Sequence, residues 1–277
     1  MPLDTLIIFD YSGTLSQEAP LFAAPDSLME ELATSGLTDF GIDRPQIFWE
    51  NLVNPTWQEG STTPAGYQKV LQDSIIATLH PDLSIHRRLR LVEAVAAFAD
   101  RYFSRSRIDP HWAPILRSID THPSVKAVIA TDHYAEATGY ILRFLGEWQI
   151  EAAAASDAAL HASAASFIVA NSADIGVHKA DPRFWKILKT RLRLDVIRHI
   201  LLIDDFGCNE QGEDVYSQPH KVEARMKQTI LTLESVFSAA VQIVPVMIGV
   251  DPHKWEMRRE KTLREAAAAI DRHLAAI

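Results

Sequence analysis

Short runs of consecutive apolar residues mark the buried strands of this chain. The runs Leu6–Phe9, Val125–Ala130 and His199–Ile203 are almost entirely apolar, and a shorter one covers Phe167–Ala170. Such runs, without alternating polar positions, are typical of strands that are covered on both faces, as in a parallel sheet between helices. The pattern predicts an α/β fold with a Rossmann-like parallel sheet. A last strand is predicted at Val241–Val250, with Pro245 indicating either a position at the sheet edge or an irregularity, because proline cannot donate a ladder hydrogen bond.

Helical periodicity fills the interval between the first two strands. From Thr14 to Thr131 the chain is far longer than one crossover helix requires, and it lacks convincing buried strands. We therefore predict a catalytic core formed by residues 1–16 and 113–277, and an α-helical cap formed by residues 17–112. The helices predicted in the cap are Asp26–Ser35, Pro64–Leu79 and Leu83–Phe103, separated by Pro- and Gly-containing stretches such as Asn54–Pro64.

The core should contain the remaining helices. Asp181 and Pro182 are a typical N-cap and first helical residue for one of them. The stretch from Glu210 to Ala240 is long, and we interpret its helical part as an extra packing helix. The predicted core helices are Pro110–Thr121, Ala135–Trp148, Glu151–Ala165, Pro182–Leu192, Lys221–Ser238 and Trp255–Ala276.

The predicted strands end in residues that can take part in chemistry. Asp10 follows the first strand, Thr131 ends the second, and Asp204 and Asp205 follow the third. Lys179 lies shortly before a predicted helix. Ligands bind outside the carboxyl ends of the strands in open α/β sheets, so we expect these side chains to share one site.

In these segments the chain resembles the haloacid dehalogenase-like (HAD) hydrolase superfamily, in its helical-cap, C1-type subclass. The similarity covers Leu6–Leu15, Val125–Tyr134, Gly176–Trp185 and Ile200–Gly212, in the order that the family has them. Asp10 matches the family's nucleophile, Thr131 its hydroxyl residue, Lys179 its lysine, and Asp204-Asp205 its metal-binding pair. The last segment has the variant form Asp-Asp-x-x-x-Asn-x-x-Gly, which ends at Gly212.

The resemblance implies a Mg²⁺-dependent phosphatase that acts through an aspartyl-phosphate. A carboxylate can attack phosphorus covalently, and Mg²⁺ prefers carboxylate and carbonyl oxygen ligands. The implied ligands are Asp10, Asp205, the backbone carbonyl of Ser12, and Asp204 either directly or through a bridging group. Lys179 and Thr131 would stabilise the phosphoryl oxygens, together with nearby backbone amides.

Ser12 departs from the family pattern. Phosphatases of the family usually carry an aspartate there, which protonates the leaving group and then activates water, and serine has no suitable pKa for that work. Two alternatives therefore stay open beside the phosphatase. One is a phosphonatase-like C–P hydrolase, with Lys69 as Schiff-base lysine. The other is a weakly active or inactive homologue that binds a phosphorylated ligand. The metal-independent dehalogenases of the family lack an acidic pair such as Asp204-Asp205.

Several residues flank this site in sequence and are candidates for binding substrate. They are Ser12, Gly13, Asp132 and His133. Asp132 stands where relatives have a neutral residue, and we interpret it as pointing to solvent and capping the helix that starts near Ala135. His133 and His178 are candidates for the missing acid, because histidine is the residue type whose ordinary pKa lies near neutrality. Aromatic residues that are candidates to line the pocket from the cap are Trp49, Trp57, Tyr67 and Tyr102.

Composition fits an enzyme of small metabolites. The chain has 277 residues, 47% of them hydrophobic, and a net charge of −9 without a dense basic cluster, which argues against nucleic-acid binding. The single cysteine, Cys208, excludes an internal disulfide and is interpreted as a packing residue. No signal peptide or membrane-spanning run is visible. We expect a cytoplasmic monomer or homodimer that acts on a small phosphorylated metabolite.

Overall fold

Six parallel strands form one sheet at the centre of the core. The computed structural model describes residues 4–122, 125–157, 165–210, 218–249 and 252–275. The strand order is β3-β4-β2-β1-β5-β6, and every neighbouring pair is parallel. The strands are β1 (Thr5–Phe9), β2 (Val125–Thr131), β3 (Ala152–Ala154), β4 (Phe167–Asn171), β5 (His199–Asp204) and β6 (Ala240–Pro245). The Rossmann-like parallel sheet that the apolar runs predict is therefore present.

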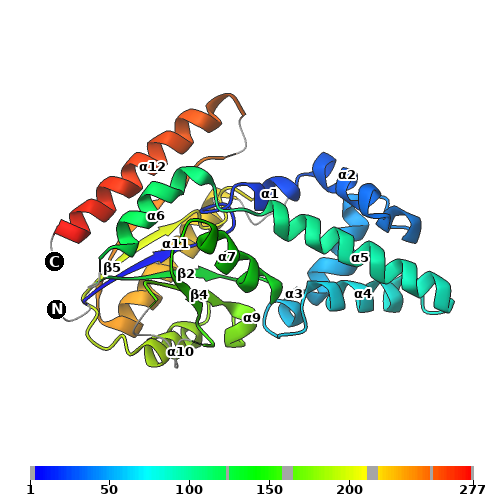
Figure 1. Ribbon diagram of the computed structural model, residues 1–277, viewed down its shortest axis with the longest axis horizontal. Coiled ribbons are helices and arrows are strands. Elements are labelled where there is room, and N and C mark those ends of the chain that lie inside the picture. Colours follow the sequence, from blue (N-terminus) through cyan, green and yellow to red (C-terminus); the bar gives the residue numbers. More distant parts are fainter. Residues whose placement is uncertain (1–3, 123–124, 158–164, 211–217, 250–251, 276–277) are drawn as a thin grey trace.

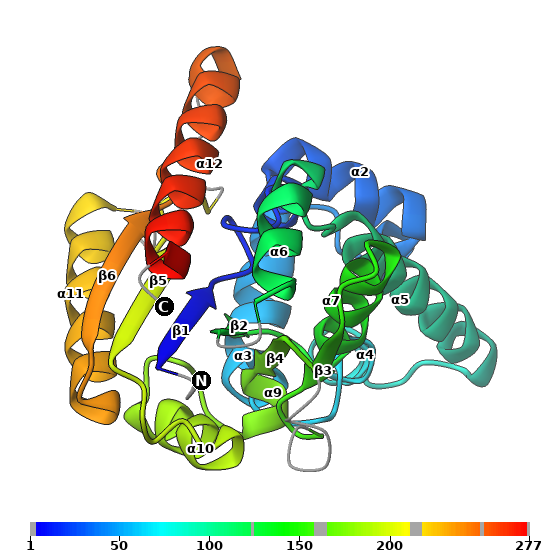
Figure 2. The same cartoon turned by 60° about the vertical axis from the view of Figure 1, so that its left-hand side comes forward.

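Alternate residues of the strands face two separate hydrophobic clusters. Ile7 and Phe9 of β1 lie in the first cluster, whereas Leu6 and Ile8 lie in the second. The first cluster includes residues of α6 (Ala113–Asp120), α7 (Glu136–Glu147) and α12 (Pro252–Ala275). The second includes residues of α9 (Ser172–Ile175), α10 (Pro182–Leu192) and α11 (Pro219–Phe237). Helices therefore cover both faces of the sheet (Figures 1 and 2).

Most of the chain between β1 and β2 forms a group of helices beyond the carboxyl ends of the strands, whereas α6 packs on one face of the sheet (Figure 1). No strand element interrupts this group in its described residues. Its hydrophobic residues join the same cluster as one face of the sheet. We call this group the cap, and its boundaries at residues 17 and 112 stay a prediction. The elements are α1 (Glu18–Phe22), α2 (Pro25–Ser35), η1 (Leu37–Phe40), η2 (Ile47–Val53), α3 (Asn54–Gly60), α4 (Tyr67–Thr78), α5 (Ile85–Arg105) and the short η3 (Pro110–Trp112).

Most predicted helices are present, but two segments differ. Glu151–Ala165 is predicted as a helix, whereas Ala152–Ala154 forms β3, because this short segment pairs with Phe167–Val169 of β4. Residues 158–164 lie outside the described residues. Asn54–Pro64 is predicted as a break, yet α3 starts there, with Pro55 in its first turn where a missing N–H is tolerated.

The carboxyl-terminal segments follow the prediction in part. β6 is an edge strand, as Pro245 indicates, but it ends at that proline, and Val250 lies outside the described residues. Helix α11 packs on the sheet through Val222, Leu233 and Phe237, which confirms its interpretation as a packing helix. None of the helices in the described ranges has the length and apolar character needed to cross a membrane.

Candidate active site

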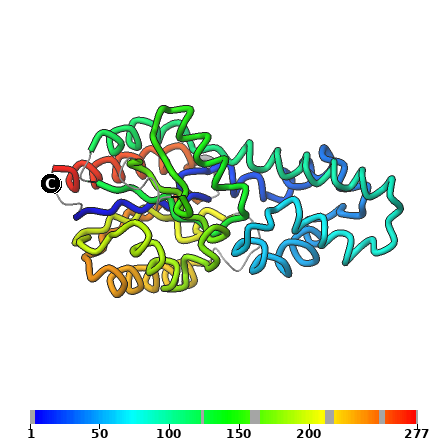
Figure 3. The backbone as a smooth tube through the Cα atoms, turned by 60° about the horizontal axis from the view of Figure 1, so that its bottom comes forward, coloured from blue at the N-terminus to red at the C-terminus, as the bar shows by residue number. Residues whose placement is uncertain are grey.

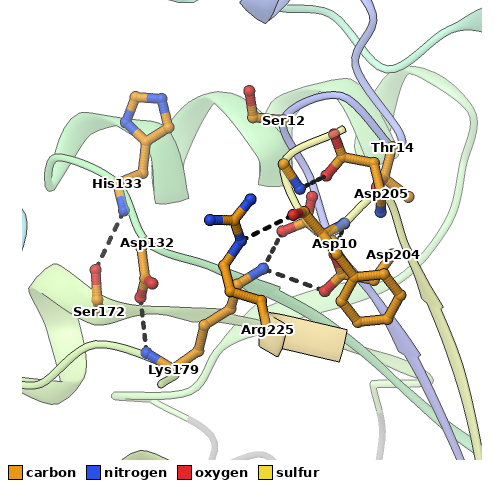
Figure 4. Close-up of polar contacts among 12 residues, drawn as sticks. Asp10, Ser12, Thr14, Asp132, His133, Ser172, Lys179, Asp204, Asp205 and Arg225 are labelled. Atoms are coloured by element: carbon orange, nitrogen blue, oxygen red, sulfur yellow. Dashed lines mark hydrogen bonds and ion pairs between the residues drawn. The ribbon is translucent and has the colours of Figure 1, made fainter. Parts of the chain in front are cut away.

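Three aspartates from two neighbouring strands converge at the carboxyl edge of the sheet (Figure 4). Asp10 directly follows β1, Asp204 is the last residue of β5, and Asp205 comes next. Their side-chain oxygens lie within 4.8 Å of one another, and the residues are only 6%, 5% and 2% exposed. Phe9 lies opposite Ile203 in the parallel β1–β5 pair, so the sheet register itself sets these carboxylates side by side.

The loop after β5 holds the acidic pair with backbone N–H groups. Asp204 Oδ1 accepts a hydrogen bond from the N–H of Phe206 at 2.6 Å. The two oxygens of Asp205 accept from the N–H groups of Gly207 and Asn209, each at 2.9 Å. Phe206 has a φ of 52°, a left-handed conformation that is costly for a residue with a side chain. Such local strain is common at functional sites.

Gly13 lets the turn after β1 approach Asp205 closely. Its φ is +73°, and a Cβ at this position would stand 2.5 Å from Asp205 Oδ2. Its N–H donates to the carbonyl of Ser16 at 2.8 Å, which closes the turn. Thr14, which the sequence analysis does not single out, accepts the N–H of Asp205 on its Oγ1 at 2.9 Å. The contacts of Gly13 are thus with the acidic pair, and binding of substrate by Gly13 stays a prediction.

Asn209 is a buried hydrogen-bonding residue that joins three segments of the site. Its Nδ2 donates to the carbonyls of Gly13 and Val246, both at 2.7 Å. Its Oδ1 accepts from the N–H groups of Ile248 at 3.0 Å and Gly249 at 2.8 Å. The amide therefore uses its full donor and acceptor capacity inside the protein. The sequence signal for Asn209 is its place in the acidic-pair motif, whose last residue, Gly212, lies outside the described residues.

Lys179 reaches into the carboxylate cluster. Its Nζ forms an ion pair with Asp10 and lies 3.4 Å from Asp204 Oδ2. The carbonyl of Lys179 accepts a hydrogen bond from Trp185 Nε1 at 2.8 Å, which fixes the backbone at the start of α10. Burial lowers the pKa of Lys179, but Asp10, Asp204 and Asp132 outweigh burial and raise that pKa well above its usual range. The lysine is therefore a permanent cation in this site.

Asp132 is part of the site, which corrects its interpretation as a solvent-exposed helix cap. Its Oδ1 accepts the backbone N–H of Lys179 at 2.8 Å. Helix α7 begins at Glu136 without a side-chain cap hydrogen bond. Burial raises the pKa of Asp132, and the charge of Lys179 opposes that rise. The carboxylate turns inward because the tertiary structure brings a backbone donor to it, which local sequence does not reveal.

Thr131 is the last residue of β2 and is 2% exposed. Since β2 lies beside β1 in the sheet, this hydroxyl is placed one strand away from Asp10. It pairs in register with Asn171 of β4 on its other side. The position suits a donor to a phosphoryl oxygen, and that contact stays a prediction.

Ser12 contacts a carboxylate that the sequence analysis does not single out. Its Oγ donates a hydrogen bond to Glu210 Oε1 at 3.2 Å. Glu210 belongs to the loop that follows Asp204 and Asp205, a segment distant in sequence from Ser12. Residues 211–217, which follow it, lie outside the described residues. The carboxylate that the sequence lacks at position 12 is thus supplied beside it by another segment.

His133 packs among aromatic rings with both ring nitrogens engaged. Its Nδ1 accepts the N–H of Tyr134 at 2.8 Å, so the hydrogen is on Nε2, which lies 2.9 Å from the hydroxyl of Tyr102. Its backbone N–H donates to Ser172 Oγ at 3.1 Å (Figure 4). Burial lowers the pKa of His133 to about 4. A neutral imidazole in these contacts is poorly suited to supply the missing proton.

His178 joins the core to the cap. Its Nε2 forms a hydrogen bond of 2.6 Å with Ser61 Oγ, and its ring stacks on Trp57 with centroids 6.2 Å apart. Ser172 Oγ donates to the carbonyl of Ser61 at 2.5 Å. Trp57 therefore lies at the cap–core contact, whereas Trp49 packs edge-on against Phe48 within the cap. His178 serves here as a docking residue.

A second set of contacts closes the cap over the core. The carboxylate of Glu136 accepts the N–H groups of Tyr67 at 2.8 Å and Gln68 at 3.3 Å, at the start of α4. The ring of Tyr67 stacks on Tyr134 with centroids 4.2 Å apart. These contacts, like those of His178, join the cap to the core.

Lys69 lies away from this site. It forms an ion pair with Asp73 one turn further along α4, and the two side chains are 64% and 58% exposed. The hypothesis of a Schiff-base lysine at position 69 therefore has no support in its placement, because an exposed pair within one helix is a common surface feature.

The residues of the site fit a divalent cation. Burial raises the pKa of Asp10 to about 7, with Lys179 opposing and Asp204 adding to the rise. Burial also raises the pKa of Asp205 well above its usual range, reinforced by the charges of Asp10, Asp204 and Glu210. Three buried carboxylates with one lysine carry excess negative charge, which a hard cation with oxygen ligands would offset. The donor set matches Mg²⁺ by its chemistry and close spacing.

Helix α11 contributes a further cation beside the acidic loop. Arg225 donates from Nε to the carbonyl of Phe206 at 2.9 Å (Figure 4). This bond fastens the helix to the strained residue of the loop. Burial and the charge of Asp205 raise the pKa of the half-buried Cys208, whose thiol is therefore kept in its protonated form. The interpretation of Cys208 as a packing residue agrees with this environment.

Comparison with solved structures finds several proteins that match this chain at low similarity. A 2-haloacid dehalogenase from Pseudomonas syringae pv. Tomato is 16% identical with a TM-score of 0.46, covering 80% of this chain and 99% of its own. The HAD-hydrolase YfnB from Bacillus subtilis, bound to magnesium, is 16% identical with a TM-score of 0.41, covering 74% and 79%. A phosphonoacetaldehyde hydrolase-like protein from Oleispira antarctica is 14% identical with a TM-score of 0.38, covering 97% and 95%. No protein-family model and no curated protein matches the sequence.

The four motif segments meet at one edge of a Rossmann-like parallel sheet, beneath helices inserted between β1 and β2. Asp10, Lys179, Asp204 and Asp205 are in contact or close to it, and Thr131 ends the adjacent strand. This meeting of the four motif segments is the arrangement that the resemblance of the sequence to the HAD-like hydrolase superfamily implies.

Proposed function

We propose that this protein is a Mg²⁺-dependent phosphatase that hydrolyses a small phosphorylated metabolite through an aspartyl-phosphate on Asp10. One observation carries the proposal: the carboxylate of Asp10 is paired with Lys179 and lies within 4.8 Å of the acidic pair. A nucleophilic carboxylate can approach a phosphate only where cations offset the repulsion between the two anions. Lys179 supplies one positive charge, and Mg²⁺ held by Asp10, Asp205 and Asp204 would supply more.

Each residue of the site has its own role in the covalent step. An oxygen of Asp10 attacks phosphorus, the bond to the leaving alcohol breaks, and the phosphoryl group remains on Asp10. Lys179 neutralises charge on Asp10 and on the phosphoryl group, and Thr131 donates to a phosphoryl oxygen from the end of β2. Water then attacks the phosphorus and regenerates the carboxylate with release of inorganic phosphate. Bound Mg²⁺ would supply electrostatic stabilisation of the phosphoryl oxygens.

The leaving alcohol needs a proton, and water must lose one. We assign this work to Glu210, whose carboxylate accepts the hydrogen bond of Ser12. Phosphatases of the family carry an aspartate where this chain has Ser12. The shorter side chain of serine leaves room for a longer acid from the neighbouring loop. A carboxyl group beside the reacting oxygen can give a proton to the alcohol and afterwards take one from water. This assignment favours an active enzyme over an inactive binding homologue.

The cap determines which metabolite can bind. It packs on the core through Ser61, Tyr67 and Tyr102, close to His133 and His178. Closure over Asp10 would exclude water other than the attacking molecule. The phosphonatase alternative depends on a lysine in the cap, and the exposed Lys69–Asp73 pair lends it no support.

A panel of phosphorylated metabolites, assayed with and without Mg²⁺, tests the function. We expect release of inorganic phosphate only with the cation, and loss of all turnover in Asp10→Asn while circular dichroism and the melting curve remain those of a folded protein. The matched control is Asp26→Asn, a change of the same kind on the exposed surface of the cap. Metal-independent turnover, or near-normal turnover in Asp10→Asn, would contradict the proposal.

A further inference from the structure

The outer face of helix α5 carries a stripe of exposed apolar side chains. Ile85, Leu89 and Val92 are 81%, 60% and 42% exposed. Their spacing of four and then three residues places them on one face of the helix. Elsewhere in the described part of the chain, the exposed large apolar side chains stand singly. This run begins at the end of the molecule that lies away from the sheet (Figure 3).

The same helix already has an apolar face that covers the interior of the cap. Leu91, Val95 and Phe98 point inward and are at most 1% exposed. A helix of one domain needs only one such face, and single exposed apolar residues are ordinary. A second face with apolar residues at alternating steps of four and three is instead typical of a seam between two helices. The half-buried Ala96 continues this face by another step.

Two hollows lie on the cap near α5, and neither is lined by Ile85, Leu89 or Val92. One, of about 280 Å³, is lined by Phe40, Glu93 and Ala97, the last two directly following stripe residues in sequence. The other, of about 410 Å³, is lined by Leu79, Leu83 and further residues that lead into α5.

The charges along α5 indicate which partner fits. Its first turns are basic, with His86, Arg88 and Arg90, and Glu93 follows one turn later on the side of His86. Arg90 is already paired with Asp39 within the cap. When two α5 helices run antiparallel, Glu93 of each faces the basic first turns of the other. The pattern is therefore complementary to itself, as a two-fold symmetric interface requires.

We propose that this face of α5 is a homodimer interface, in which two copies of the chain pair their caps through antiparallel α5 helices. In this arrangement Leu89 packs near Val92 of the partner copy, and Ile85 packs near its Ala96. The cores with their active sites then lie outside the interface. The inference does not depend on the proposed phosphatase activity, because it rests on the exposure, spacing and charge of α5 alone.

Sedimentation equilibrium of the full chain over a concentration series tests the interface. We expect wild-type protein to dimerise reversibly, and Leu89→Glu to weaken the dimer by at least about tenfold, since a buried charge in both copies opposes association. The matched control is Leu231→Glu, on α11, where the leucine has the same exposure of 60%. Circular dichroism should report an unchanged fold for both variants. A wild-type monomer at all concentrations, or a dimer indifferent to Leu89→Glu, would overturn the proposal.

Cross-linking tests the direction of the two helices in a Cys208→Ser background. Ile85→Cys mixed with Ala96→Cys should form a disulfide-linked dimer under mild oxidation, whereas Ile85→Cys by itself should not. In a parallel pair the two Ile85 positions would instead meet. Efficient self-linking of Ile85→Cys, without the mixed product, would show that the antiparallel arrangement is wrong.

Discussion

The hydroxyl of Ser12 donates a hydrogen bond to the carboxylate of Glu210 at 3.2 Å. Position 12 lies two residues after the proposed nucleophile, and Glu210 lies five residues after Asp205. The site thus has a carboxylate near the place where leaving-group chemistry occurs, although the local sequence around Asp10 does not contain it. This contact changes what mutations at either position are expected to do.

Replacing Glu210 tests its role in proton transfer. We expect Glu210→Gln to lower turnover of alkyl phosphates by about 10²- to 10⁴-fold, the usual contribution of a positioned acid or base. Turnover of 4-nitrophenyl phosphate should fall much less in the first, phosphoryl-transfer step, because nitrophenolate leaves without a proton. Steady-state and burst kinetics on both substrates measure this difference. Glu234→Gln, in an exposed position of α11, is the control, and equal losses on both leaving groups would contradict the assignment.

An aspartate at position 12 should help only when Glu210 is absent. Ser12→Asp alone places a second carboxylate beside Glu210, and the repulsion between them disfavours the charged site. We therefore expect Ser12→Asp to reduce turnover, and Ser12→Asp/Glu210→Gln to recover part of what Glu210→Gln loses. The kinetics of the four proteins form a double-mutant cycle. Additive effects of the two changes would show that the residues do not share this work.

Magnesium binding should depend on pH through Asp10. Burial raises the pKa of this carboxyl to about 7, so below that pH the metal-free folded protein holds a proton that the cation must displace. The increase of the melting temperature by Mg²⁺ should therefore be larger at pH 8 than at pH 6. Asp205→Asn should abolish it at both values. Differential scanning fluorimetry measures the shift, and a shift that is independent of pH would contradict the role of Asp10 as ligand.

Gly13 and Gly41 have the same backbone conformation. Comparing their substitutions therefore separates the effect of backbone strain from the effect of close approach to a carboxylate. Gly13 has a φ of +73° and Gly41 of +78°, but only Gly13 has a neighbouring carboxylate where a Cβ would stand. Both substitutions by alanine should lower the free energy of unfolding by roughly 1–2 kcal/mol, because the left-handed region is unfavourable for alanine. Gly13→Ala should in addition abolish the Mg²⁺-induced stabilisation, whereas Gly41→Ala should retain it. If both variants retained the Mg²⁺-induced stabilisation, the turn would be able to shift without disturbing the acidic pair.

The burial of His133 should make the protein less stable in acid. Its pKa in the folded state is lowered from 6.5 to about 4, so between these values the unfolded chain binds more protons than the folded one. The neutral His133 contributes on the order of 3 kcal/mol to the free energy of unfolding above pH 6.5. This contribution is lost as the pH falls towards 4. Urea unfolding at pH 7 and 4.5 should show a smaller acid loss for His133→Gln than for the wild type. An identical loss would mean that His133 is protonated without cost.

The sequence by itself determined the strands β1, β2, β4 and β5 and the order of the motifs. Continuous apolar runs at β1, β2 and β5 can be stable only between two covered faces, and strands of that kind bring their carboxyl ends to one edge. Asp10, Thr131, Asp204 and Asp205 could therefore be assigned to one site before any coordinates. Lys179 was assigned to the site through the resemblance of its segment, and the helix start at Asp181–Pro182 could be predicted because capping is a local interaction that adjacent residues specify.

The tertiary structure alone decided the contacts between segments that are distant in sequence. Asp132 turns inward because the N–H of Lys179 is there to bond it, and Ala152–Ala154 is a strand because β4 offers it a free edge. Glu210 and Asn209 gain their places because the loop after β5 folds back on the turn after β1. Local propensity contains none of this, because a side chain takes the best partner that the folded chain brings within reach, whichever segment supplies it.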